Sequence, residues 1–155
     1  MPEMNPDEAR RRFEAARVAR LATVDVAGRP HLVPVVFAAH DDGIVTAVDR
    51  KPKRTTRLKR LHNVAVTPAV CLLADAYDED WDRLWWVRAD GGARIVPPDA
   101  EDAVTRQAYE NALALLRRKY PQYRDDPPHG PVIAVTVHHW TGWHAGPSPA
   151  ADPAG

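Results

Sequence analysis

The residues best suited to binding chemistry form one dense cluster of bases. Seven Lys and Arg side chains lie within residues 50–60, and no acidic residue interrupts them. Thr55 and Thr56 stand inside this run, where a short helix is expected to begin. Free N–H groups at a helix N-terminus favour anions, and Lys and Arg add charge-assisted hydrogen bonds. The run therefore suits a phosphate group, and a solvated basic turn is the alternative interpretation.

These bases do not indicate a nucleic-acid partner. Surfaces that bind single strands interleave aromatic side chains with bases, and residues 50–60 contain no aromatic residue. The chain has 21 Lys and Arg against 21 Asp and Glu, so its formal net charge is zero. Because nucleic-acid-binding domains usually carry a basic excess, we expect no nucleic acid here.

A second segment, residues 75–88, combines acids with aromatic side chains and contains Trp81, Trp85 and Trp86. Successive side chains of a strand point to opposite faces, so Trp85 and Trp86 are expected on opposite sides of a sheet. One would pack in the core and the other would line a pocket or an interface. The acids lack the spacing of a calcium loop, so we expect them to face bases of the same or a second chain.

No metal site or side-chain nucleophile is predicted. The seven histidines show no recognisable ligand spacing, and Cys71 lies in an apolar run with no second cysteine in the chain. Gly-x-Ser-x-Gly, Walker-type and Gly-x-Gly-x-x-Gly motifs are absent from the sequence. The sequence therefore points to a cofactor that is held by other means.

Short β-rich segments must position these residues. Strands are predicted at residues 20–24, 31–37, 44–48, 70–74, 84–88, 93–96 and 132–137, with a hairpin turn at 90–92. Helices are predicted from residue 5 to about 17, at 55–61, and from the cap Asp99 to about Tyr120. Six or more antiparallel strands, with a long helix before the last one, favour a barrel because closure removes exposed strand edges. Pro34 lacks an N–H and is expected at an edge or a bulge.

The length and composition fit one domain. The chain has 155 residues, of which 45% are apolar. We predict a single domain over residues 1–145 and a disordered tail, rich in Pro, Ala, Ser and Gly, over 146–155. Residues 1–12 show no signal peptide or apolar span, so a cytoplasmic location without membrane contact is expected.

Several segments resemble a known family. Arg20-Leu21-Ala22-Thr23-Val24, followed by Gly28-Arg29-Pro30-His31 and Val33-Pro34-Val35, is similar to the opening hairpin of the pyridoxamine-phosphate-oxidase-like split β-barrel superfamily. Other segments are similar, more narrowly, to the actinobacterial deazaflavin-dependent group of this superfamily. They are Lys51-Pro52-Lys53-Arg54, residues 77–81 and 84–88, and the ending Trp140-Thr141-Gly142-Trp143-His144-Ala145.

The resemblance implies a mainly β protein, a split β-barrel that works as a homodimer and binds coenzyme F-420, or alternatively FMN, at the subunit interface. The cofactor phosphate would rest on Lys51, Lys53, Arg54, Thr55 and Thr56. The ring system would lie along Val33, Pro34, Val35 and Val36, where proline leaves no unpaired N–H beside a flat apolar ring. The residues that would close the pocket, in part from the second subunit, are Tyr77, Trp85, Trp86 and Arg88.

The implied activity is hydride transfer between the cofactor and a small conjugated organic substrate. In such chemistry the cofactor supplies the reactive carbon, and the protein supplies position and electrostatics. A protein that only binds or stores a flavin is the alternative.

Overall fold

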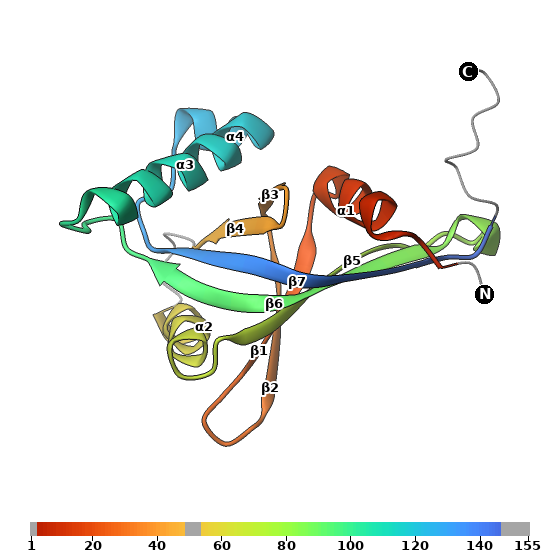
Figure 1. Ribbon diagram of the computed structural model, residues 1–155, viewed down its shortest axis with the longest axis horizontal. Coiled ribbons are helices and arrows are strands. Elements are labelled where there is room, and N and C mark those ends of the chain that lie inside the picture. Colours follow the sequence, from red (N-terminus) through yellow and green to blue (C-terminus); the bar gives the residue numbers. More distant parts are fainter. Residues whose placement is uncertain (1–2, 49–53, 147–155) are drawn as a thin grey trace.

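The computed structural model describes residues 3–48 and 54–146, with the backbone alone for residues 54–58 (Figure 1). The helices are α1 (Pro6–Ala15), α2 (Arg54–Val66), α3 (Ala103–Lys119), α4 (Pro121–Asp125) and the short 3-10 helix η1 (Trp81–Arg83). The strands are β1 (Ala19–Val24), β2 (Pro30–Val35), β3 (Ala38–His40), β4 (Gly43–Ala47), β5 (Ala69–Ala76), β6 (Trp85–Val96) and β7 (Val132–His144). The predicted tail, apart from residue 146, lies outside the described residues.

The strands of the described ranges form one antiparallel, curled sheet in the order β2-β1-β5-β6-β7-β4-β3. In the view of Figure 1, α2 lies on one side of the long strands and α1, α3 and α4 lie on the other. The long helix α3 precedes the last strand, β7. The prediction of a mainly β split barrel with a long helix before its final strand is therefore confirmed.

Strand β2 is an edge of this sheet, because among the described strands it pairs with β1 alone. Pro34 stands opposite Arg20 in that pairing. A proline removes one ladder donor, so it is tolerated where one side of the strand has no neighbour. Of the two positions predicted for Pro34, an edge or a bulge, the structure shows the edge.

The hairpin predicted around residues 90–92 is wrong. Strand β6 runs without interruption from Trp85 to Val96, and its register against β7 shifts between Asp90 and Gly91. Gly91 faces the backbone of Thr136 so closely that a Cβ atom would collide with the Thr136 carbonyl. The glycine pair therefore serves a bulge and a close backbone approach, and not the turn that the same residues usually mark.

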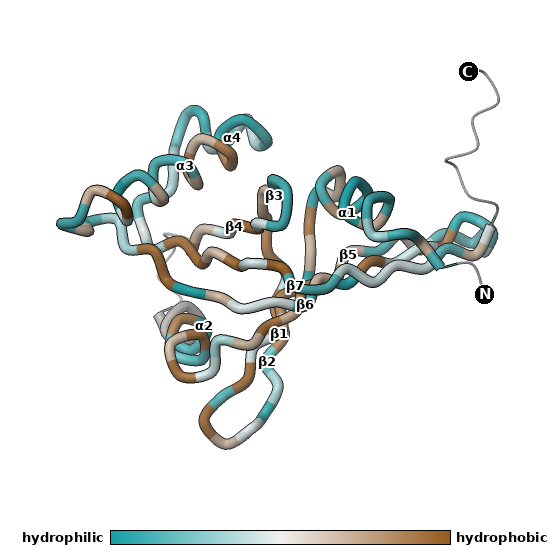
Figure 2. The backbone as a smooth tube through the Cα atoms, in the orientation of Figure 1, coloured by the Kyte–Doolittle hydropathy of each residue, from teal (hydrophilic) through white to brown (hydrophobic). Residues whose placement is uncertain are grey.

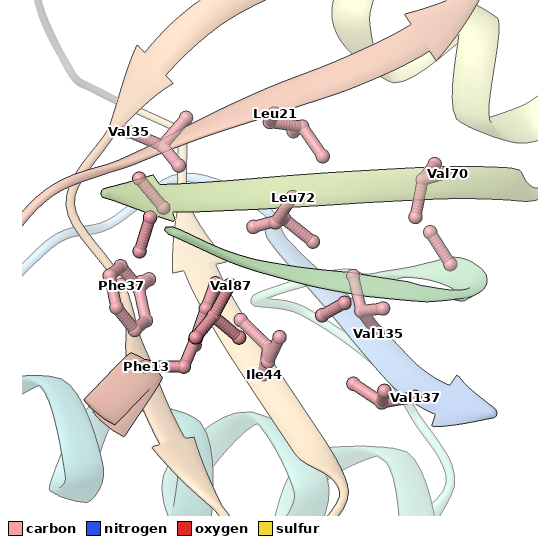
Figure 3. Packing of buried hydrophobic residues seen from close by; sticks show 14 of the residues in the cluster. Phe13, Leu21, Val35, Phe37, Ile44, Val70, Leu72, Val87, Val135 and Val137 are labelled. Carbon is pink, nitrogen blue, oxygen red and sulfur yellow. The ribbon is translucent and has the colours of Figure 1, made fainter. Parts of the chain in front are cut away.

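The core lies on the concave face of the sheet, and α1 covers part of it. Phe13 of α1 packs against Phe37, with ring centroids 4.7 Å apart, and against Trp140 of β7 at 5.4 Å. Figure 3 shows these phenylalanines beside Leu21, Leu72 and other buried aliphatic side chains. In Figure 2, α3 and α4 alternate between hydrophilic and hydrophobic residues, as expected for helices that cover a core on one side.

Two helix starts carry clear caps. The side chain of Asn5 accepts a hydrogen bond from the Glu8 N–H at 2.9 Å, as predicted for α1. Asp102, and not Asp99, caps α3, because its carboxylate accepts from the Thr105 N–H at 2.8 Å. None of the helices in the described ranges is long and apolar enough to cross a membrane.

We predict that Gly91→Ala lowers the free energy of unfolding by about 1–3 kcal/mol, because the new methyl group meets rigid backbone. Gly92→Ala is the matched control, since its Cβ would meet only the His138 side chain at 3.6 Å. The control should stay within about 0.5 kcal/mol of the parent protein. Urea unfolding measures both, and equal midpoints for the two variants would contradict the close approach.

Candidate functional site

A cavity of about 390 Å³ opens where β2 meets α2 and α4. All four residues predicted to carry the cofactor ring contribute to its wall, so the structure brings residues 33–36 together around one hollow. The complete lining is Val33, Pro34, Val35, Val36, Ala47, Arg60 and Tyr123. Three of these, Ala47, Arg60 and Tyr123, were not assigned to the site from the sequence.

The lining suits a flat apolar group with an anionic extension. Valine side chains provide the wall, and Pro34 adds no N–H that a planar ring would leave without a partner. Arg60 supplies a permanent positive charge at one side. Tyr123 supplies an aromatic face and a hydroxyl. A flavin or deazaflavin, with its planar ring and phosphate-bearing tail, fits this donor set.

Cavity-lining residues stand in sequence at both ends of the basic run, residues 50–60. It begins three residues after Ala47 and ends with Arg60, and both of these residues line the hollow. Lys51 and Lys53 lie outside the described residues. Arg54, Thr55 and Thr56 form the first turn of α2, as part of the helix expected there. Their assignment to a phosphate site stays a prediction.

The side chains predicted to close the pocket lie elsewhere in the chain. Tyr77 follows β5 and is 82% exposed. Trp85 packs against the core on the α1 side, with the Arg12 guanidinium 5.5 Å from its ring centroid. Neither residue lines the cavity formed by β2.

Trp86 and Arg88 occupy the opposite face of β6 from Trp85, as strand alternation predicts. The Arg88 guanidinium donates to Asp90 at 3.0 Å on that face. Within one chain these two side chains are also absent from the cavity wall. Their predicted role, like that of Tyr77 and Trp85, would require a second subunit.

A tyrosine clamp holds the chain where it leaves the cavity. The Tyr120 hydroxyl accepts from the Phe37 N–H at 3.1 Å and lies within hydrogen-bond distance of the carbonyls of Phe37 (2.8 Å) and Arg17 (2.9 Å). Phe37 directly follows Val36 of the cavity wall, and Tyr120 joins α3 to α4, which carries Tyr123. The clamp therefore couples two parts of the lining that are far apart in sequence.

Lys119 reinforces this junction from the end of α3. Its ammonium donates to the carbonyls of Ala16 at 2.6 Å and Glu14 at 3.1 Å, and it lies 3.8 Å from the ring centroid of Phe37. Burial, helped by the nearby charge of Arg17, lowers the pKa of Lys119 to about 8. The sequence predicts only that a base stands in the last turn of this helix. The hydrogen bonds of Lys119 to carbonyls more than 100 residues away could not be predicted from local sequence.

The other residues considered for chemistry have structural surroundings. Asp75, from the acidic segment, pairs with Arg20 Nη1 at 3.2 Å, so this acid faces a base of its own chain. Burial raises the pKa of the half-buried Cys71 thiol, which keeps it protonated and unreactive near neutral pH. Within the ranges that the structure describes, no three His, Cys, Asp or Glu side chains gather where they could hold a metal ion.

An antiparallel, curled sheet with flanking helices and a long helix before its last strand defines a split β-barrel. The chain belongs to the pyridoxamine 5'-phosphate oxidase family, whose model matches residues 6–144. No curated protein is significantly similar in sequence.

Solved structures share the fold at low sequence identity. A FAD-binding protein from Mesorhizobium loti has a TM-score of 0.67 at 18% identity, over 91% of this chain and 93% of that one. The FAD-binding protein from Mycobacterium smegmatis has a TM-score of 0.60 at 19% identity, over 92% and 95%. The heme storage protein of Vibrio cholerae has a TM-score of 0.61 at 15% identity, over 89% and 90%. At these identities the likeness concerns the fold alone.

We predict that Tyr120→Phe destabilises the protein by about 1–3 kcal/mol, because it leaves the Phe37 N–H without its partner next to a fully buried ring. Tyr77→Phe is the control, since the exposed Tyr77 side chain makes the same chemical change at the surface. Thermal unfolding should show a lower Tm for the first variant only. An unchanged Tm for Tyr120→Phe would show that the clamp does not hold this junction.

Proposed function

We propose that the protein is an oxidoreductase that uses coenzyme F-420 to transfer a hydride to or from a small conjugated organic substrate. The observation that carries the proposal is the cavity along residues 33–36, whose wall includes both the end of β4 before the basic run and Arg60 at the end of that run. In this arrangement the ring lies on β2 and the anionic tail reaches the bases. FMN is the alternative cofactor.

The density of the bases supports the longer cofactor tail. Seven Lys and Arg side chains within residues 50–60 exceed what a single phosphate monoester needs for charge neutralisation. The tail of F-420 is longer and more anionic than that of FMN, so it can engage more of these bases. FMN also carries a phosphate that suits the basic run, so the preference for F-420 is part of the proposal and is tested by the titration below.

In this proposal the residues of the chain bind the cofactor, orient it and exclude water from one side of its ring. When bound, the cofactor supplies the carbon that gives or takes the hydride. Val33 and Val35 form an apolar wall that keeps water from one side of the ring, and Pro34 leaves no competing N–H at the strand edge. Arg60 holds the anionic part in register with the ring.

A non-catalytic flavin or deazaflavin carrier is the second candidate, and the cavity lining favours it in one respect. Of the side chains that line the cavity, only Arg60 and Tyr123 carry polar groups. A carrier needs to hold its cofactor, and it does not need a group that protonates a substrate. Acceptor-dependent turnover distinguishes the two candidates.

We also propose that the protein works as a homodimer that packs through the outer face of its sheet. Register pairs align one row of side chains across five strands on that face, namely Pro34, Arg20, Leu73, Arg88 and Thr141. Leu32, two residues from Pro34 on the same strand, is 65% exposed. Because Pro34 belongs both to this row and to the cavity wall, a second copy on this face would border the cavity.

Cofactor binding is tested by fluorescence titration with F-420, FMN and heme in separate experiments. We expect F-420 to bind most tightly, and Arg60→Gln to weaken it at least tenfold through the loss of a charge-assisted hydrogen bond. Arg106→Gln, an exposed arginine on α3, is the matched control and should leave the affinity unchanged. Tight FMN binding would select the alternative cofactor, and heme binding without F-420 or FMN binding would overturn the proposal.

Turnover is measured with reduced F-420 and a panel of quinone and enone acceptors. Cofactor oxidation above the buffer rate supports the oxidoreductase. Tight binding of F-420, with no oxidation of the reduced cofactor by any acceptor, would favour the non-catalytic carrier over the oxidoreductase.

The dimer is tested by light scattering at micromolar concentration. The expected mass is twice the 17.2 kDa of one chain. Leu32→Glu should lower that mass towards the monomer, because it places a charge on the proposed contact face. Val104→Glu, at an 82% exposed position on α3, should not. A monomer mass for the parent protein would refute the dimer.

A further inference from the structure

One histidine stands beside the cavity but outside its lining. His31 lies on β2, two and four residues before Val33 and Val35. Side chains at this spacing share one face of a strand, so all three point to the same side of the sheet. His31 therefore continues the cavity wall along its own strand, towards the side where α2 packs on β1.

The charged groups around His31 are mostly positive. Burial lowers the pKa of His31, and the positive charges of Lys59 and Arg60 on α2 lower it further. Hydrogen bonds from the N–H groups of Arg29 at 2.8 Å and Ala27 at 2.9 Å lower the pKa of Asp25, and the charge of Lys59 adds to this effect. The charge of Lys59 thus acts on both the turn and the histidine.

Two of the buried polar atoms in this region matter here, because they have no hydrogen-bond partner among the described residues. One is Nδ1 of His31, and the other is Oδ1 of Asn63. Asn63 is 1% exposed, and its amide donates to Thr23 Oγ1 at 3.1 Å. Thr23 is the register partner of His31 across the β1–β2 pair. Both unpartnered atoms therefore flank one threonine.

Such atoms are costly unless something satisfies them. A protonated His31 would present an N–H from Nδ1, which needs an acceptor such as Asn63 Oδ1 or a bound anion. A neutral ring next to two cations is the state expected while no anion is present. The surroundings of His31 therefore favour protonation of its ring when an anion binds nearby.

We propose that His31 is a further cation of the anion site, and that it takes up a proton when an anion binds beside Lys59 and Arg60. The inference rests on the proposed function only for the identity of the natural anion, which would be the phosphate-bearing tail of the cofactor. A bound anion offsets the repulsion from both bases and so favours the imidazolium form. By linkage, anion affinity then increases as pH falls through the range in which His31 titrates.

The direct test follows the His31 ring by NMR between pH 4.5 and 8, with sulfate as the probe. Sulfate stays fully ionised over this range, and sodium chloride at equal ionic strength is the reference. We expect sulfate to raise the midpoint of His31 by about 0.5–1 pH unit. His40, which is exposed and beside Asp41 at 3.4 Å, is the internal control for non-specific effects of sulfate on the spectrum.

Two variants separate this role from a purely structural one. Lys59→Gln removes one repelling charge from an exposed position, so the midpoint of His31 should rise without sulfate and respond less when sulfate is added. His31→Gln should remove the pH dependence of sulfate binding, whereas His40→Gln should keep it. A His31 midpoint that is the same with and without sulfate would overturn the proposal.

The cofactor supplies an independent arm of the experiment. FAD, whose pyrophosphate does not titrate between pH 5 and 8, should bind up to about tenfold more tightly for each unit of falling pH within the His31 range. A sulfate response without flavin or deazaflavin binding would support the role of His31 and refute the proposed function. Cofactor binding with no shift in the titration midpoint of His31 would support the proposed function and refute the role of His31.

Discussion

The close approach of β6 and β7 is the constraint on which the rest of the molecule depends. β6 is the central strand of the sheet, and it pairs with β5 on one side and with β7 on the other. Gly91 allows its backbone to lie directly against Thr136, where any larger residue would push the strands apart. The bulge at this point bends both long strands, and bending turns a flat sheet into a curled half-barrel. Helix α1 then packs into the concave side through Phe13.

The cavity lies away from this central pair of strands, at the edge strand β2. An edge strand has free backbone on one side, which suits a ligand that must approach the main chain closely. Its position is held by side chains in place of a second ladder. The Tyr120 hydroxyl binds the backbone of Phe37, and the Thr46 hydroxyl donates to the carbonyl of Val36 at 2.8 Å. These bonds supply the order that a neighbouring strand would otherwise provide.

Charge is distributed unevenly although the net charge is zero. Among the described side chains, the bases Lys59 and Arg60 of α2 lie near β2, and acids follow β5 around Asp78 and Asp80. Lys59 and Arg60 then act on His31 and on whatever anion enters the cavity, which makes proton binding and anion binding interdependent.

The sequence by itself determined the fold class, because strand alternation and helix-end signals are local properties that survive folding. The missing N–H of Pro34 indicates an edge or a bulge, and the strand order of the sheet decides for the edge. The assignment of residues 33–36 to the ring comes from the family resemblance, and the structure adds that these four residues line one cavity. The prediction for residues 90–92 was wrong, since a glycine pair marks a turn or a bulge equally well and only the strand opposite decides between them. Arg60 and Tyr123 are far apart in sequence, and their meeting at β2 follows from how α2 and α4 pack. The pairing of Tyr120 with Phe37 was likewise decided by the tertiary structure, because a buried hydroxyl bonds whichever backbone groups the fold leaves without partners.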